Sequence, residues 1–91
     1  MHFEWDEQKR QEVIDERGVD ILYAARIFKN PVLVKPDIRN EYGESRFEAL
    51  GHVDNEFFVL IYTMRGKMIR LITAWKAGRN GEKEYKNSLF G

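Results

Sequence analysis

Residues 46–75, with the sequence RFEALGHVDNEFFVLIYTMRGKMIRLITAW, decide the fold of this chain. They contain three runs rich in β-branched and aromatic residues, which favour strands, at 46–53, 56–64 and 67–75. Links of two residues at 54–55 and 65–66 separate the runs, and links this short are typical of β-hairpins. The stretch therefore predicts three neighbouring strands of an antiparallel meander.

The residues before the meander predict a short strand followed by two helices. Residues 3–5 alternate apolar and polar side chains, as in a half-buried strand. Asp6 and Asp20 are of a type that accepts hydrogen bonds from the free N–H groups at a helix start. The first helix should end at Gly18, and the second should end before Asn30-Pro31.

Further elements are predicted on both sides of the meander. The aliphatic run 32–34 predicts a strand, and residues 38–43 predict a loop. The pair Asn80–Gly81 breaks the pattern, and residues 82–90 predict a closing helix. The residues of this helix expected to point inward are Tyr85, Leu89 and Phe90.

This order of elements predicts an α+β domain that spans residues 1–91. Its sheet should be largely antiparallel and should consist of the short N-terminal strand plus the meander. Two N-terminal helices and one C-terminal helix should cover one face of the sheet. The other face, or a groove at its edge, is then left for function.

Composition excludes several classes of protein. A chain of 91 residues has room for one core, and 43 % of its residues are hydrophobic. The absence of cysteine excludes disulfides and thiolate metal sites, and two histidines are too few for a convincing metal cluster. The N-terminus lacks the apolar run of a secretory signal, and the longest apolar runs are far shorter than the roughly 20 residues that span a bilayer. We therefore expect a cytoplasmic protein without a metal, a cofactor or a membrane partner.

The formal net charge of zero conceals an asymmetry along the chain. Residues 1–50 hold 8 basic and 11 acidic residues, and residues 51–91 hold 7 and 4, so the halves carry −3 and +3. No carboxylate lies between Glu56 and Glu82, where five cations occur: Arg65, Lys67, Arg70, Lys76 and Arg79. Such cations can converge on phosphates, and Tyr62 and Trp75 in the same region can stack a base. The alternative is that they form the solvent-facing side of an ordinary meander.

Two further groups are candidates for acid–base chemistry. Glu44 and Arg46 point the same way if residues 44–46 are extended. They form either a surface ion pair or a carboxylate held beside a cation in an active site. Histidine has an unperturbed side-chain pKa near 6.5, so His52 is either a general acid or base or a structural residue of the sheet.

Blocks spread along the chain resemble, in order, those of the BrnT toxins. The blocks are Phe3-Glu4-Trp5-Asp6 with Lys9, Gly18-Val19, Ala24-Ala25-Arg26-Ile27-Phe28, Tyr42-Gly43-Glu44-Ser45-Arg46, Gly51, Tyr62-Thr63-Met64-Arg65 and Ile69-Arg70-Leu71-Ile72-Thr73-Ala74. The resemblance implies a compact α+β fold similar to RelE ribonucleases. It also implies metal-independent cleavage of RNA that inhibits translation.

The resemblance also implies the partners of the protein. These are the RNA substrate and a BrnA-type antitoxin, a ribbon-helix-helix protein that neutralises the toxin and represses the operon as a complex with it. Operator DNA is expected to be contacted through the antitoxin alone. We expect a toxin homodimer within a toxin–antitoxin heterotetramer.

Cleavage of RNA through its 2′-hydroxyl assigns roles to the candidate residues. Cations must stabilise the charge that builds on the phosphate oxygens, a role we assign to Arg46, Arg65 and Arg70. A base must remove the 2′-proton, a role open to Glu44 or His52. The residues expected to hold flanking RNA are Lys67, Trp75, Lys76 and Arg79.

Two positions depart from the pattern that the resemblance implies. Arg17 stands where these toxins usually have histidine, and Trp75 stands where they usually have arginine. An alternative is therefore a catalytically weakened module that binds RNA or the antitoxin and acts as a co-repressor. A third possibility is a protein-interaction domain with no role on nucleic acid.

Overall fold

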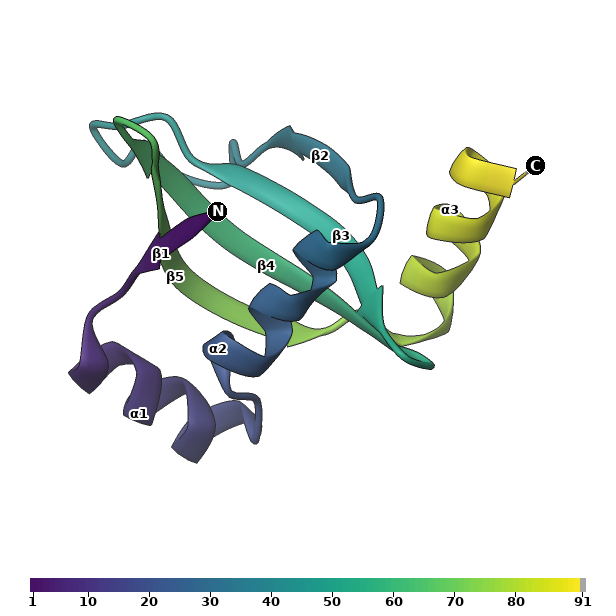
Figure 1. Cartoon of the computed structure of the whole chain (residues 1–91), viewed down its shortest axis with the longest axis horizontal. Coiled ribbons are helices and arrows are strands. Elements are labelled where there is room, and N and C mark those ends of the chain that lie inside the picture. Colours follow the sequence, from purple (N-terminus) through teal and green to yellow (C-terminus); the bar gives the residue numbers. More distant parts are fainter. Residues whose placement is uncertain (91) are drawn as a thin grey trace.

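The computed structural model describes residues 1–89 in full and the backbone of Phe90. The elements, in chain order, are β1 (His2–Glu4), α1 (Glu7–Arg17), α2 (Ile21–Ala24), the 3₁₀ helix η1 (Ala25–Lys29), β2 (Leu33–Pro36), β3 (Phe47–Val53), β4 (Glu56–Arg65), β5 (Met68–Lys76) and α3 (Gly78–Phe90) (Figure 1). Within this described part, no helix is both long enough and apolar enough to cross a lipid bilayer.

The predicted meander is confirmed. Strands β3, β4 and β5 pair antiparallel in sequence order, and their ends fall within one residue of the predicted ones. The pairing of β4 with β5 shifts register between Ile61 and Tyr62. Strand β2 pairs antiparallel with β3 and runs on to Pro36, which a sheet tolerates because β2 is an edge strand.

The sheet is largely antiparallel as predicted, but it is mixed, because one of its four strand pairs is parallel. Strand β1 pairs with β5 and runs parallel to it, so the strand order is β1-β5-β4-β3-β2. The first and second strands therefore lie at opposite edges, and α1, α2 and η1 carry the chain from one edge to the other (Figure 1). Local sequence could not show this, because β1 pairs with a strand more than 60 residues away.

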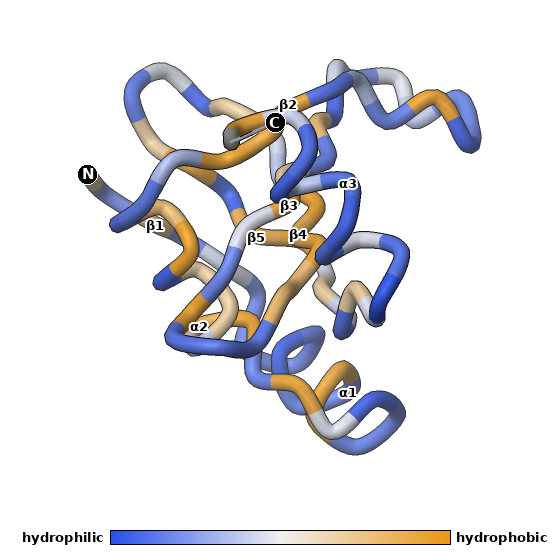
Figure 2. The backbone as a smooth tube through the Cα atoms, turned by 90° about the vertical axis from the view of Figure 1, so that its right-hand side faces the viewer, coloured by the Kyte–Doolittle hydropathy of each residue, from blue (hydrophilic) through white to orange (hydrophobic). Residues whose placement is uncertain are grey.

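Helices cover both faces of the sheet, which corrects the second part of the prediction. Helices α1, α2 and η1 pack on one face around fully buried Ile21, Ile27 and Leu60. Helix α3 packs on the other face, where Tyr85 joins a second apolar cluster with Leu50. Figure 2 shows the central strands as hydrophobic along much of their length, with hydrophilic loops around them.

Helix α3 differs from its prediction in start and in orientation. It begins at Gly78 and runs through Asn80–Gly81, where a break was predicted. This turn of the helix requires glycine, because a Cβ at position 81 would lie only 2.6 Å from the Ala77 Cβ. Tyr85 is buried as predicted, and its hydroxyl donates to the Pro31 carbonyl at 2.6 Å. Leu89 is exposed, so its predicted inward position is wrong, and the Phe90 side chain lies outside the described residues.

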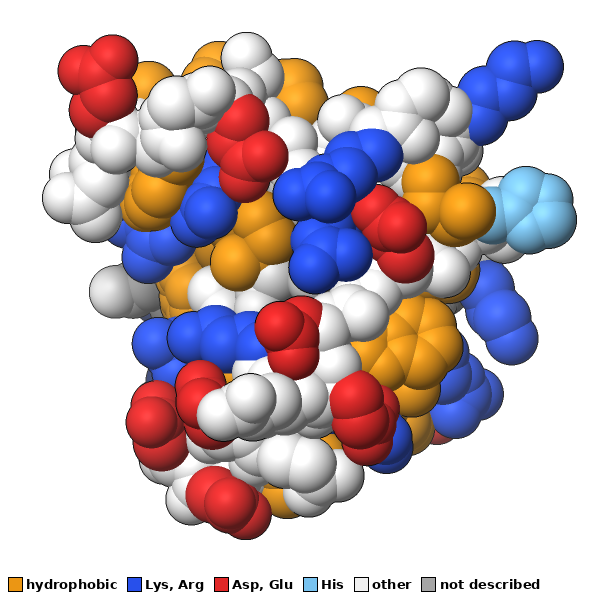
Figure 3. Space-filling model, turned by 90° about the vertical axis from the view of Figure 1, so that its left-hand side faces the viewer, with side chains coloured by type: hydrophobic (Ala, Val, Ile, Leu, Met, Phe, Trp, Pro, Cys, Tyr) orange, Lys and Arg blue, Asp and Glu red, His pale blue; other side chains and the backbone are white. Residues whose placement is uncertain are grey.

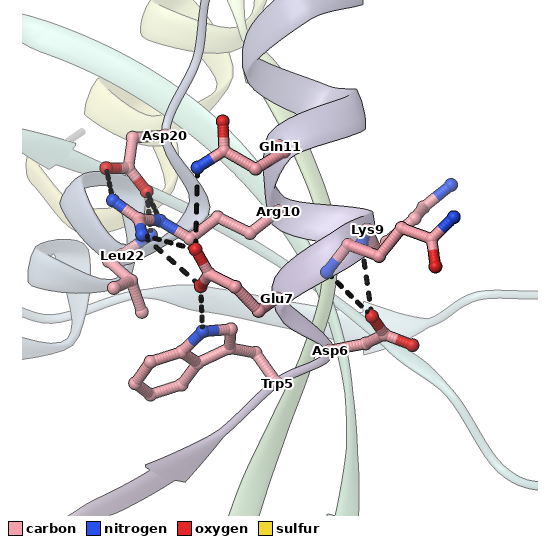
Figure 4. A network of polar contacts seen from close by, with 9 residues as sticks. Trp5, Asp6, Glu7, Lys9, Arg10, Gln11, Asp20 and Leu22 are labelled. Atoms are coloured by element: carbon pink, nitrogen blue, oxygen red, sulfur yellow. Dashed lines mark hydrogen bonds and ion pairs between the residues drawn. The ribbon is translucent and has the colours of Figure 1, made fainter.

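The two N-terminal helices begin at the predicted caps and are joined by an arginine (Figure 4). Asp6 Oδ1 accepts from the N–H groups of Gln8 and Lys9 at the start of α1, and Asp20 Oδ1 accepts from the Leu22 N–H at the start of α2. Arg10 Nε and Nη2 donate to the two Asp20 oxygens at 2.8 and 2.7 Å, which lowers the pKa of Asp20. This pair fixes the start of α1, and with it Asp6, against α2.

Candidate functional site

The segment that carries Glu44 and Arg46 is held against the sheet by its own backbone. The Asp37 N–H donates to the Arg46 carbonyl at 2.9 Å and closes the loop between β2 and β3. The Thr63 hydroxyl of β4 donates to the Ser45 carbonyl at 2.6 Å. These bonds fix the backbone at residues 45 and 46, so the side chains of Glu44 and Arg46 project from a defined place.

Arg46 has two further contacts that orient its guanidinium. Its Nε donates to Glu44 Oε2 at 3.0 Å, and its Cζ lies 3.9 Å from the centre of the Tyr42 ring. A guanidinium over an aromatic face gains from the negative potential of the ring. The ion pair expected from the spacing of Glu44 and Arg46 is therefore present, and it lies at the rim of a cavity described below.

A buried carboxylate anchors the same loop. Arg39 Nε and Nη2 donate to the two oxygens of Asp37 at 2.8 and 3.0 Å. The Asp37 side chain is fully buried, and the bonds from Arg39 hold the pKa of Asp37 below its ordinary value. The Arg39 guanidinium also lies 5.1 Å from the centre of the Trp75 ring.

The hairpin of β4 and β5 contributes two more arginines on one face of the sheet. Arg65 pairs with Met68, and Thr63 pairs with Arg70. Arg65 and Arg70 are thus diagonal neighbours, which share a face and are close enough for long side chains to meet. Arg70 is partly buried, and Arg65 is more exposed.

These separate segments meet in one cavity of about 400 Å³. It is lined by four cations, two carboxylates and two aliphatic residues: Lys9, Arg46, Arg65, Arg70, Asp6, Glu44, Leu71 and Ile72. We call this cavity the arginine cleft. Figure 3 shows Lys and Arg side chains gathered on this side of the molecule with carboxylates beside them. A larger hollow of about 800 Å³ under the loop at 36–47 shares Glu44 and Arg46 with it.

The structure therefore brings together four of the five residues predicted to be catalytic, Glu44, Arg46, Arg65 and Arg70. Cations arranged around a cavity suit the oxygens of a phosphodiester, since arginine can donate two parallel hydrogen bonds to phosphate.

His52 lies elsewhere. It is in β3, its ring packs against those of Phe57 and Tyr85 with centroids 5.5 and 5.4 Å away, and its Nδ1 lies 2.9 Å from the Asp54 carbonyl oxygen. It does not line the arginine cleft. These contacts agree with the alternative that His52 is a structural residue of the sheet.

The predicted RNA-binding residues occupy different places. Lys67 is exposed in the turn between β4 and β5, two residues after Arg65. Lys76 ends β5, about 20 Å along the strand from Arg70 at the usual rise per residue. Lys76 and Arg79 line a separate cavity of about 240 Å³ with Glu56 and Glu82.

The two positions that depart from the BrnT pattern contact each other. The Arg17 guanidinium lies 5.1 Å from the centre of the Trp75 ring, as the Arg39 guanidinium does. A base that stacked on Trp75 would compete with these cations for the ring. Neither Arg17 nor Trp75 lines the arginine cleft.

Sequence reasoning missed two groups at the site. Lys9 was given no role at the site, although the first turn of α1 places it on the wall of the cleft. Glu4 pairs in register with Arg70 and lies within 4 Å of both hairpin arginines. Both belong to the first block of the BrnT resemblance, which was a signal that could have identified them.

No group of three or more His, Cys, Asp or Glu side chains is placed to hold a metal ion in the described part of the chain.

An α+β fold with a cleft lined by cations from four separate segments defines a protein suited to binding a polyanion. Residues 5–81 match the model of a family described as the ribonuclease toxin BrnT of type II toxin–antitoxin systems. The chain belongs to this family, so it is a ribonuclease toxin with RNA as its substrate and an antitoxin protein as its partner. No curated protein matches the chain.

Proposed function

We propose that the protein is a metal-independent RNA endonuclease and that the arginine cleft is its active site. The observation that carries this proposal is the convergence of Glu44, Arg46, Arg65 and Arg70 from a loop and two strands on one cavity. Membership of the BrnT family identifies the polyanion as RNA.

The cleft contains the groups that cleavage through the 2′-hydroxyl requires. Glu44 takes the 2′-proton as the 2′-oxygen attacks phosphorus, and the bond from phosphorus to the 5′-oxygen breaks. Arg46, Arg65 and Arg70 stabilise the charge on the phosphate oxygens. The leaving 5′-oxygen takes a proton from Lys9, an ammonium on the same wall. The products are a 2′,3′-cyclic phosphate and a 5′-hydroxyl.

Cleavage then needs no metal ion, because arginine side chains perform the charge stabilisation that a bound cation performs in other nucleases.

The cellular role follows from this activity and from the family. We infer a RelE-like fold in a cytoplasmic toxin that inhibits translation by cutting RNA, and that a BrnA-type ribbon-helix-helix antitoxin neutralises. The toxin is proposed to form a homodimer within a toxin–antitoxin heterotetramer and to reach operator DNA through the antitoxin. Lys67, Trp75, Lys76 and Arg79 remain proposed contacts for RNA that extends beyond the cleft.

The second candidate, a weakened module that acts as a co-repressor, is motivated by Arg17 and Trp75. The structure places both residues outside the wall of the arginine cleft. The absence of an arginine at position 75 therefore leaves the four cations of that wall in place. This favours the active enzyme over the weakened module.

The test is cleavage of single-stranded RNA by purified protein in buffer containing EDTA. We expect the wild type to cut, and we expect Arg46→Ala and Arg70→Ala each to lower the single-turnover rate constant about 10²- to 10³-fold. Arg26→Ala is the matched control, because Arg26 is exposed on η1 and does not line the arginine cleft, and its rate should equal that of the wild type.

Thermal unfolding of each variant shows whether it is folded. Expression of the wild type without antitoxin should arrest growth. A wild type that neither cuts RNA nor arrests growth would support the weakened module, and restored cutting in Trp75→Arg would confirm that module.

A further inference from the structure

Glu4 has unusual surroundings for a carboxylate. It ends β1 and pairs in register with Arg70 of β5. Its Oε1 lies 3.7 Å from Arg70 Nη1 and 3.8 Å from Arg65 Nε. The same oxygen is buried and has no hydrogen-bond partner among the described residues.

These distances set Glu4 apart from the carboxylates that bind arginine elsewhere in the molecule. Asp20, Asp37 and Glu44 each accept arginine N–H groups at 2.7 to 3.0 Å, and Glu7 accepts from Arg10 at 3.1 Å. An N···O separation of 3.7 Å is beyond hydrogen-bond length, although the electrostatic attraction persists. Glu4 therefore attracts Arg65 and Arg70 without accepting their N–H groups, which stay available to a phosphate.

The same carboxylate reduces the repulsion between two like charges. Arg65 and Arg70 are diagonal neighbours on one face of the sheet, and two guanidiniums so placed repel each other. A negative charge within 4 Å of both offsets that repulsion. The effect should be larger on Arg70, whose side chain is 27 % exposed, than on Arg65, whose side chain is 57 % exposed.

We propose that Glu4 is a positioning residue, which holds Arg70 and Arg65 in the orientation that meets the scissile phosphate of RNA. This inference rests on the proposed function. If this is so, removal of the Glu4 carboxylate should raise the affinity for RNA and lower the rate of cleavage. Loss of the carboxylate makes the cleft more positive and strengthens binding of RNA, while the loosened guanidiniums slow the chemical step.

The experiment compares the wild type, Glu4→Gln and Glu12→Gln. Glu12→Gln is the matched control, because Glu12 is an exposed carboxylate of α1 outside the cleft. Binding is measured with single-stranded RNA whose 2′-hydroxyls are replaced by hydrogen, which prevents cleavage, and chemistry is measured by single-turnover cleavage of the same sequence with its hydroxyls. The side-chain Nε–H signals of Arg65 and Arg70 are followed by NMR.

In Glu4→Gln we expect affinity for the uncleavable RNA to rise about fivefold at low salt. We expect the single-turnover rate constant to fall about ten- to a hundredfold. The Arg70 Nε–H signal should become as mobile as that of an exposed arginine. Glu12→Gln should match the wild type in all three measurements.

A structural role would instead lower the melting temperature and move affinity and rate in the same direction, which would overturn the inference. An unchanged Arg70 signal in Glu4→Gln would overturn it as well. If the wild type does not cut RNA, the proposed function fails, and the affinity and NMR measurements still decide whether Glu4 orients the arginines.

Discussion

At the scale of single residues, Gly51 sets how closely the helical layer approaches the sheet. A Cβ at this position of β3 would lie 2.9 Å from Ile27 Cβ and 3.0 Å from Val32 Cγ1. Neither atom is the free end of a flexible side chain, and Ile27 is completely buried. The sheet and η1 therefore touch here through glycine backbone, and the position has no room for a larger residue.

Gly51→Ala should consequently destabilise the protein. The added methyl group must push η1 away from β3, so we expect the free energy of unfolding to fall by about 1–3 kcal/mol. Urea denaturation followed by circular dichroism measures this change. Asn87→Ala, an exposed substitution on α3, serves as the control and should stay within about 0.5 kcal/mol of the wild type. Equal midpoints for Gly51→Ala and the wild type would contradict the close approach.

At the scale of elements, the loop between β2 and β3 matters most, because it carries Glu44 and Arg46 without regular secondary structure. It is held by the buried Asp37 carboxylate with Arg39, by the Asp37 N–H and by Thr63. An ion pair at the base of the loop therefore supports the place where Arg46 enters the cleft.

This ion pair predicts a dependence of stability on pH. The pKa of Asp37 is lowered on folding because Arg39 donates to its carboxylate. Its contribution to stability is therefore complete above the unfolded value of about 3.9, and it is lost as pH falls through the lower folded pKa. We expect the melting temperature of the wild type to drop below about pH 4.

Arg39→Met isolates the contribution of Asp37 from that of Asp20, which Arg10 binds in the same way. The variant should be less stable than the wild type at neutral pH, and the two melting curves should converge as pH is lowered toward about 2. Melting temperatures measured from neutral to acidic pH test this. A difference between the two proteins that stays constant at every pH would show that Asp37 is not the group responsible.

At the scale of the whole molecule, four cations of the basic half divide between two cavities. Arg65 and Arg70 line the arginine cleft, while Lys76 and Arg79 line a separate cavity at the far end of β5. An RNA strand that reached both cavities would be cleaved in the arginine cleft, and Lys76 and Arg79 would bind its phosphates in the other cavity.

Removing the second set should therefore weaken binding without slowing chemistry. For the Lys76→Ala/Arg79→Ala double variant, we expect lower affinity for RNA and a slope of log affinity against log salt that is smaller by about 0.7 for each lost phosphate contact. The single-turnover rate constant at saturating RNA should stay at the wild-type value. If that rate constant falls as in Arg70→Ala, then the two cavities are not functionally separate.

Local sequence patterns determined the elements and the types of residue at the site. Two-residue links between β-rich runs fixed the meander, and aspartates placed both N-terminal helix starts. The family blocks identified the BrnT toxins and included Glu44, Arg46, Arg65 and Arg70. These features could be predicted from the sequence because each link, helix cap or block consists of residues close together in the chain.

The remaining features were determined by the tertiary structure alone, because they depend on contacts between residues that are distant in the chain. It paired β1 with β5, placed α3 on the second face and placed His52 outside the arginine cleft. It also brought Glu4 to Arg70 and Arg17 to Trp75. Residues more than 50 positions apart meet through the packing of the whole chain, which no local pattern encodes.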